Sequence, residues 1–143
     1  MPKAKDVMKK PAITIKGIAT VYEAVKMMVE TGVRGLIVEK RNENDAYGMI
    51  AIRDIIHRVI GKGLDPKKVK VNQIMSKPVV SVSPDMDIEY VARLLANLNF
   101  ARVAVIGDKD QLLGVISMMD ILKAVSQENF RNFAGFLKDS IVS

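Results

Sequence analysis

The sequence repeats itself, and this repeat constrains the fold more than any other feature. The segment Val7–Ile15 aligns with Ile74–Val82 at an offset of 67 residues. After a one-residue deletion in a loop, the offset becomes 66 and Gly48 aligns with Gly114. The repeat covers almost the whole chain. The sequence therefore predicts two homologous units of about 65 residues each.

Each repeat predicts the same order of elements: strand, helix, strand, strand, helix. The first strand is short and follows a proline. The first helix carries apolar residues at helical spacing; it begins at Thr20, which forms a capping box with Glu23, and in the second repeat at Asp87. The predicted strands are residues 13–15, 36–39 and 47–52, then 80–82, 103–106 and 112–116. The apolar helix positions are Val21, Ala24, Val25 and Met28, repeated as Ile88, Val91, Ala92 and Leu95.

These patterns divide the chain into three parts. Residues 1–66 form the first unit with the N-terminal segment and the start of a linker, and residues 67–126 form the second unit. The lysine-rich linker, residues 61–71, is interpreted mainly as a solvated loop, with an anion-binding surface as the alternative. Residues 127–143 form a helical tail with three Phe, which either docks a partner or packs on its own domain.

Composition limits the chemistry that the chain can perform. The chain has no Cys and a single His57, which excludes thiolate chemistry, His-based metal sites and most His-dependent triads. The formal net charge of +6 favours an anionic partner such as a nucleotide, a nucleic acid or an acidic protein surface. No Gly-rich phosphate loop is present. We therefore expect no catalytic site and no metal site.

The N-terminus carries charged residues without an apolar stretch behind them. No run approaches the roughly 20 apolar residues that span a bilayer. We therefore expect a cytoplasmic protein with no membrane partner.

The stretch Gly114–Asp120 offers candidate ligand-binding groups. An apolar strand ends near Ser117, and Asp120 lies three residues into the apolar-periodic helix that follows. A hydroxyl and a carboxylate beside the first N–H groups of a helix suit a phosphate oxygen and a ribose diol. The same spacing is that of a capping box, in which both side chains only satisfy backbone N–H groups. The sequence leaves both interpretations open.

The duplication, the element order and the terminal Gly-x-x-Ser-x-x-Asp together resemble the tandem CBS-domain pair, or Bateman module, over residues 6–126. The resemblance implies an α/β (α+β) fold of two β-α-β-β-α units related by a pseudo-twofold axis. It also implies two clefts for adenosine-containing ligands such as AMP, ADP, ATP or S-adenosylmethionine. In such modules the Asp holds the ribose diol and the hydroxyl contacts ribose or phosphate; here these are Asp120 and Ser117.

The resemblance also assigns the remaining positions of each cleft. Arg34 is a candidate phosphate contact, with a solvated surface cation as the alternative, and ordinary core packing is the alternative for Met8 and Ile13. In the second cleft Ala51 replaces Ser or Thr, so we expect about three- to tenfold weaker binding there, or an empty site. The main cleft comprises Ser117, Asp120, Met8, Ile13, Val33 and Arg34. The second comprises Asp54, Met75, Val80, Ala101 and Arg102, with His57 as a half-exposed helix residue nearby.

The expected function is regulation without catalysis. An adenine nucleotide or S-adenosylmethionine would act as the regulatory ligand, with no catalytic cofactor, and a conformational change would signal to a separate effector protein. The resemblance also implies a homodimer formed through apolar helices. The alternatives are a nucleic-acid-binding protein and a ligand-free scaffold or dimerisation protein. The aromatic content of 5% argues against a base-stacking platform.

Overall fold

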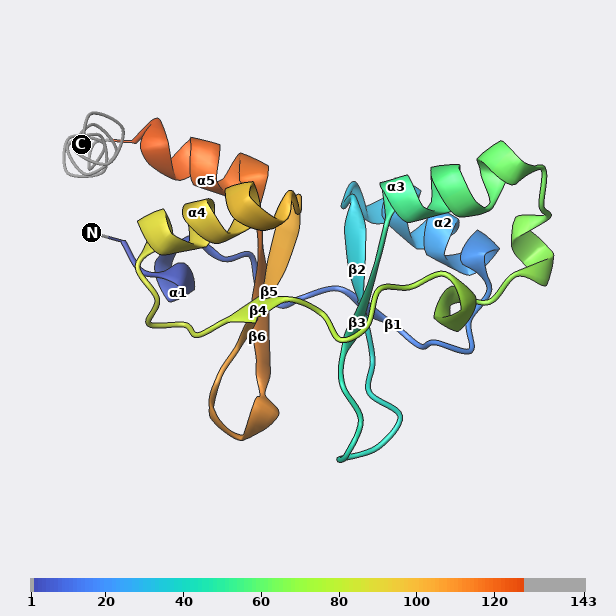
Figure 1. Ribbon diagram of the computed structural model, residues 1–143, viewed down its shortest axis with the longest axis horizontal. Helices are drawn as coiled ribbons and strands as arrows, with labels where there is room; N and C mark the ends of the chain where they lie inside the picture. The colour runs from blue at the N-terminus through green and yellow to red at the C-terminus, as the bar shows by residue number, and fades with distance from the viewer. Residues whose placement is uncertain (1, 128–143) are drawn as a thin grey trace. The chain divides into compact units, whose positions relative to one another are not determined.

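Each repeat builds one three-stranded sheet with helices beside it (Figure 1). In the first sheet, β1 runs parallel to β2, and β2 pairs antiparallel with β3. The second sheet repeats this arrangement with β4, β5 and β6, which confirms the predicted fold class. The computed structural model describes residues 2–127. Its elements are α1 (Ala4–Val7), β1 (Thr14–Ile15), α2 (Val21–Thr31), β2 (Gly35–Val38), β3 (Gly48–Ala51), α3 (Ile52–Arg58), β4 (Ser81–Val82), α4 (Ile88–Leu98), β5 (Arg102–Ile106), β6 (Leu112–Ser117) and α5 (Met118–Val125), with 3₁₀ turns at Ile60–Lys62, Pro66–Lys68, Val71–Gln73 and Asp108–Asp110.

The described residues group into two compact units. The first unit is residues 13–79, and the second unit is residues 2–12 together with residues 80–127. The N-terminal segment joins the second unit through its backbone: the Ala4 N–H donates to the Met86 carbonyl at 2.8 Å, and the Ile88 N–H donates to the Pro2 carbonyl at 3.0 Å. The predicted boundaries 1–66 and 67–126 describe the repeat along the sequence and stay a prediction. In space, each unit includes the segment that precedes the other unit's first strand.

The predicted apolar stripes of the two long helices lie against the two hydrophobic cores. Fully burying one aliphatic side chain stabilises a fold by about 1.5–3 kcal/mol, so these stripes fix each helix on its sheet. The matched core residues are Val21, Ala24, Met28, Leu36, Val38 and Ile50 in the first unit, and Ile88, Val91, Leu95, Val103, Val105 and Ile116 in the second.

The two long helices begin differently. Thr20 caps α2 as predicted, because its Oγ1 accepts a hydrogen bond from the Glu23 N–H at 3.1 Å. The Glu23 side chain does not return the contact to the Thr20 backbone, so the predicted capping box is only half formed. The helix α4 begins after Asp87 as predicted, but the Asp87 side chain makes no cap hydrogen bond. Its carboxylate pairs instead with the Lys3 ammonium. The helix α1, which the sequence did not predict, begins after Lys3 and brings its ammonium within reach of Asp87.

Asp45, in the loop between β2 and β3, is an ionic anchor of the first unit. Its carboxylate accepts from the Arg41 backbone N–H at 2.9 Å, from Arg41 Nε at 3.0 Å and from Lys77 Nζ at 2.6 Å. The Arg41 guanidinium and the Lys77 ammonium hold the pKa of this carboxyl well below its usual range. The anchor ties the loop to the segment that follows Met75.

We expect Asp45→Asn to lower the thermal midpoint at pH 7 and to flatten its acid dependence. Because the folded pKa is depressed, the folded chain binds fewer protons than the unfolded chain just below pH 4. The stabilisation is thus present above the unfolded pKa of about 3.9 and is lost as the pH falls below it. Thermal unfolding between pH 2 and pH 7 measures this, with Glu43→Gln, exposed in the same loop, as the control. Parallel pH curves for Asp45→Asn and wild type would contradict the prediction.

Candidate functional site

The first turn of α5 carries the Ser117–Asp120 pair. Ser117 ends β6, and its Oγ accepts a hydrogen bond from the Asp120 N–H at 3.2 Å. In return, Asp120 Oδ2 accepts from the Ser117 N–H at 2.8 Å and from the Ser117 hydroxyl at 3.0 Å. The predicted capping box is therefore formed. All three of its hydrogen bonds leave the second carboxylate oxygen, Oδ1, to other contacts.

Asp120 is a buried carboxylate whose counter-charge is an exposed lysine. Its side chain is only 5% exposed, whereas the side chain of Lys9 is 65% exposed. Lys9 Nζ lies 3.6 Å from Asp120 Oδ1. This is ion-pair distance, longer than a hydrogen bond. A buried carboxylate needs such compensation, and here the compensating group is one that can turn into solvent.

Residues 8 and 9 reach this place through a short backbone bridge to β6. The Lys9 N–H donates to the Val115 carbonyl at 2.9 Å, and the Val115 N–H donates to the Lys9 carbonyl at 3.1 Å. A Cβ on Gly114 would lie 2.6 Å from the Lys9 carbonyl oxygen and 2.9 Å from Met8 Sδ. Gly114, which opens the motif, therefore permits the close approach that brings Lys9 to Asp120.

The first unit contains a less complete copy of this site. Asp54 Oδ2 accepts from the Ala51 N–H at 2.8 Å, which matches the backbone half of the Ser117–Asp120 box. Ala51 has no hydroxyl, and α3 has no side-chain cap hydrogen bond. The start of α3 is thus held by one carboxylate contact. The start of α5 is held by two reciprocal contacts between Ser117 and Asp120.

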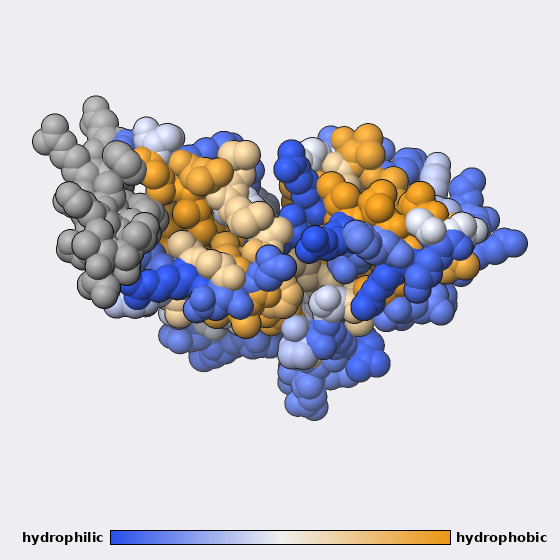
Figure 2. Space-filling view, turned by 45° about the horizontal axis from the view of Figure 1, so that its top comes forward, coloured by the Kyte–Doolittle hydropathy of each residue, from blue (hydrophilic) through white to orange (hydrophobic). Residues whose placement is uncertain are grey.

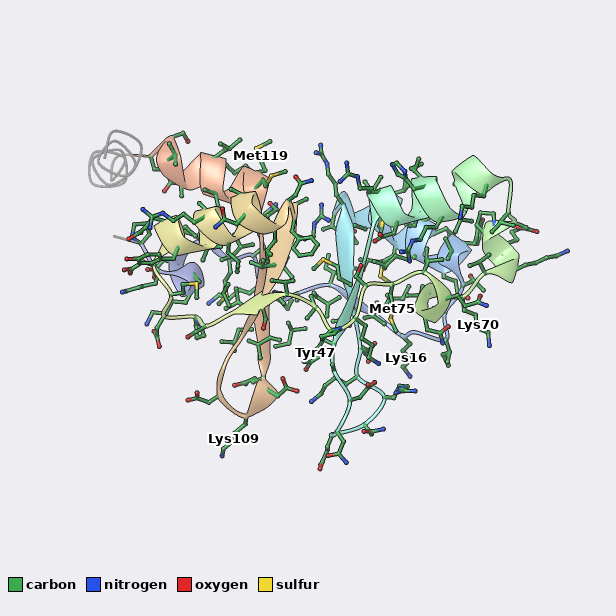
Figure 3. The ribbon with its side chains drawn as sticks, in the orientation of Figure 1. Lys16, Tyr47, Lys70, Met75, Lys109 and Met119 are labelled. Carbon is green, nitrogen blue, oxygen red and sulfur yellow. The ribbon has the colours of Figure 1, made fainter. Side chains whose placement is uncertain are left out.

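The backbone bridge of the second unit is repeated in the first. Met49 and Ser76 exchange N–H to carbonyl hydrogen bonds, each of 2.9 Å. A Cβ on Gly48 would lie 2.9 Å from Met75 Sδ, and Figure 3 shows Met75 near β3. Ser76 stands at the position that matches Lys9. The two sites therefore share a frame, which consists of the glycine, the backbone bridge and the carboxylate. They differ in that only the second unit has the Ser117 hydroxyl and the Lys9 cation.

The other predicted site residues divide between the two units. Ile13, Val33 and Met75 pack against the core of the first unit, and Met8 and Val80 pack against that of the second. For Met8 and Ile13 this agrees with the core-packing alternative. Arg34 is exposed, and its carbonyl accepts from the Ile52 N–H at 3.0 Å. Arg102 pairs in register with Ser117 across β5 and β6. The second unit holds Ser117, Asp120, Met8, Val80, Ala101 and Arg102, and the first holds Ile13, Val33, Arg34, Asp54 and Met75. That these two groups meet in shared clefts stays a prediction.

Lys9 is the residue that sequence reasoning missed. The offset of 67 that places Met8 beside the motif places Lys9 there too, and it pairs Lys9 with Ser76. The signal available in the sequence was that the charged Lys9 of one repeat aligns with the neutral Ser76 of the other. Nothing local in the sequence distinguishes Lys9 from Lys10.

The lysine-rich segment is more structured than predicted. Its lysines are exposed, as a solvated segment requires, but it contains 3₁₀ turns, one of which begins where Asp65 Oδ1 accepts from the Lys67 N–H at 3.0 Å. The Lys67 ammonium lies 4.8 Å from the centre of the Tyr22 ring, a cation–π contact.

His57 lies exposed on α3.

Residues 2–127 contain no group of three His, Cys, Asp or Glu side chains that could hold a metal ion. In the same part of the chain, no helix is long and apolar enough to cross a membrane. The predicted Phe-bearing tail lies outside the described residues.

Comparison with known proteins decides the family. The CBS-domain model matches the chain twice, at residues 4–61 and 71–127. The chain belongs to the CBS-domain family. The two matches confirm the tandem CBS pair that the repeat predicted.

Curated and solved CBS proteins agree with this assignment. An uncharacterised protein of Methanopyrus kandleri is 30% identical over 118 residues, which cover 82% of this chain and 60% of that protein. The chain thus spans less than two thirds of that relative. The hexameric CBS-CP12 protein from bloom-forming cyanobacteria is 44% identical, with a TM-score of 0.83 over 90% of this chain and 74% of that chain. The cytosolic domain of the Mg²⁺ channel MgtE, solved in complex with ATP, is 25% identical, with a TM-score of 0.69 over 86% of this chain and 48% of that chain.

Proposed function

We propose that this CBS pair is a non-catalytic regulatory module that binds an adenosine-containing ligand at Asp120. The observation that carries the proposal is the state of that carboxylate. It is buried, one oxygen is fixed by the helix cap, and the other lies 3.6 Å from the Lys9 ammonium. Vicinal hydroxyls of a ribose are donors that such an oxygen accepts. The ATP complex of the related MgtE domain supports the same ligand class.

The two copies of the site differ in strength in this proposal. The Asp120 site has the Ser117 hydroxyl, a reciprocal cap and Lys9. The Asp54 site has Ala51 in place of the hydroxyl, so it binds the same ligand more weakly or remains empty.

The ligand signals by changing the arrangement of the two units, which a separate effector protein detects. Regulation of this kind requires a ligand that binds the two arrangements with different affinity. The cap connects Asp120 to β6 through Ser117 and to α5 through its own backbone, so occupancy of the carboxylate acts on both elements of the second unit.

A thermal-shift panel tests the proposed function. AMP, ADP, ATP, adenosine, S-adenosylmethionine and GTP are added to the wild-type chain at one protein concentration. A ligand present at ~100 times its dissociation constant stabilises the native state by about 2.7 kcal/mol. We expect adenosine ligands to raise the midpoint and GTP to leave it unchanged. A panel with no adenosine-selective rise would refute the proposal. Duplex DNA and single-stranded RNA in the same panel test the nucleic-acid alternative.

We also propose that two copies of the chain associate through α3 and α5. Repeat-matched apolar residues are exposed on these helices: Ile52 and Ile56 on α3, and Met118 and Leu122 on α5. Figure 2 shows hydrophobic surface on both units. Soluble proteins rarely leave such patches uncovered, and the related CBS-CP12 protein is a hexamer.

Charge placed on these two helices should separate the copies. Leu122 is 60% exposed, so Leu122→Glu should leave the fold intact while burying a carboxylate in any contact between copies. We expect the Ile56→Glu, Leu122→Glu double variant to sediment as a monomer at concentrations at which wild type associates. Lys123→Gln, one residue away and exposed, serves as the control. An unchanged mass for the double variant would rule out this interface.

A further inference from the structure

We infer that Lys9 reads the charge of the ligand at Asp120, so that the site prefers a 5′-phosphorylated adenosine to adenosine itself or to the cationic S-adenosylmethionine. The inference rests on the proposed function, because it concerns the ligand of the same site. The inference goes beyond the proposed function because it names the residue that selects among adenosine-containing ligands.

The geometry gives Lys9 a fixed backbone and a free end. Its N–H and carbonyl are both hydrogen-bonded to Val115, at 2.9 and 3.1 Å. Its side chain, by contrast, is 65% exposed and stops 3.6 Å short of Asp120 Oδ1. The ammonium can therefore leave the carboxylate without breaking a hydrogen bond or moving β6. With its backbone fixed and its ammonium exposed, Lys9 is suited to contact a ligand that carries a negative charge.

The charges of the site favour an anion once the ribose is bound. Before binding, Lys9 and Asp120 neutralise each other. When the diol donates to Oδ1, it takes over the space in front of the carboxylate, and the ammonium needs a new acceptor. A phosphate oxygen offers a charge-assisted hydrogen bond, the stronger kind. A sulfonium in the same place would meet a like charge.

The other repeat supplies an internal comparison. Ser76 stands at the position of Lys9, and the cation beside it, Lys77, is bound to Asp45 at 2.6 Å. The frame of glycine, backbone bridge and carboxylate does not itself need a lysine at this position, because the first unit forms it with a serine. Lys9 is thus an addition to the frame of the second unit, and a role in selecting the ligand explains it.

Isothermal titration of four proteins with adenosine, AMP, ATP and S-adenosylmethionine tests the inference. The proteins are wild type, Lys9→Met, Lys9→Arg and the neighbouring control Lys10→Met. Lys9→Met keeps the apolar stem and removes the charge. We expect wild type to bind AMP about tenfold more tightly than adenosine, as one charged hydrogen bond predicts. Lys9→Met should lose this preference, so that its affinities for AMP and adenosine lie within about twofold of each other. Lys9→Arg and Lys10→Met should retain it.

Three results would overturn the inference. An undiminished AMP preference in Lys9→Met would show that the phosphate does not use Lys9. A parallel loss of AMP and adenosine binding would show that Lys9 only supports the fold of the site. Tighter binding of S-adenosylmethionine than of AMP by wild type would show the opposite selectivity. If wild type binds none of the four ligands, the proposed function itself fails, and this result is distinct from the other three.

Discussion

Replacing Gly114 with Ala is expected to lower the free energy of unfolding by about 2–3 kcal/mol. The new Cβ would lie 2.6 Å from the carbonyl oxygen of Lys9, a backbone atom that is itself hydrogen-bonded to Val115. Relief requires the N-terminal segment to move away from β6. The substitution should therefore also weaken ligand binding at Asp120, because Lys9 moves with the segment.

The chain provides graded controls for this prediction. A Cβ on Gly48 would meet Met75 Sδ at 2.9 Å and the Ser76 carbonyl at 3.1 Å, a milder backbone clash at the matched position. A Cβ on Gly107 would meet only the end of the Leu113 side chain, at 3.0 Å, which can turn away. Urea unfolding should rank the losses in the order Gly114→Ala, Gly48→Ala, Gly107→Ala. An equal loss for Gly114→Ala and Gly107→Ala would show that the close approach is not a constraint.

The repeat explains how much of the fold could be predicted from the sequence. Val21, Ala24 and Met28 recur as Ile88, Val91 and Leu95, and both sets are buried as their helical spacing predicts. The strands follow the predicted segments closely, because alternating and apolar runs are bounded by polar loops. Ser117 and Asp120 form the capping box that their spacing predicts. In each case the cause is local, so a short window of sequence contains it.

What the sequence did not reveal depends on contacts between distant segments. The ion pair of Lys3 with Asp87 joins residues 84 positions apart, and it changed the predicted cap of α4. The approach of Lys9 to Asp120 depends on a backbone bridge between the N-terminus and β6. Neither contact has a periodic or local signature. The internal repeat was the available guide, since a difference between matched positions marks a residue that the shared frame does not need.

Asp120→Asn is expected to weaken AMP binding by about 100-fold, because two charge-assisted hydrogen bonds to the diol are worth about 1.5–3 kcal/mol each before partial compensation. The substitution keeps the shape of the side chain. Its amide has one oxygen, which the Ser117 N–H and the Ser117 hydroxyl hold at the position of Oδ2. The NH₂ group then faces the ligand and Lys9, and it offers a donor where the ribose needs an acceptor.

The matched substitution in the other repeat separates the two sites. Asp54→Asn changes the same kind of carboxylate, which accepts from the Ala51 N–H at 2.8 Å. We expect it to alter AMP affinity less than about twofold, since the stronger site lies in the other unit. Ser117→Ala completes the set: it removes the cap hydroxyl at a cost of about 1 kcal/mol in stability but leaves the carboxylate in place. Titration calorimetry on the three variants, with thermal unfolding to verify each fold, measures these effects. If Asp54→Asn abolishes binding and Asp120→Asn does not, the main site lies in the first unit, and the hydroxyl and cation of the second unit serve only its structure.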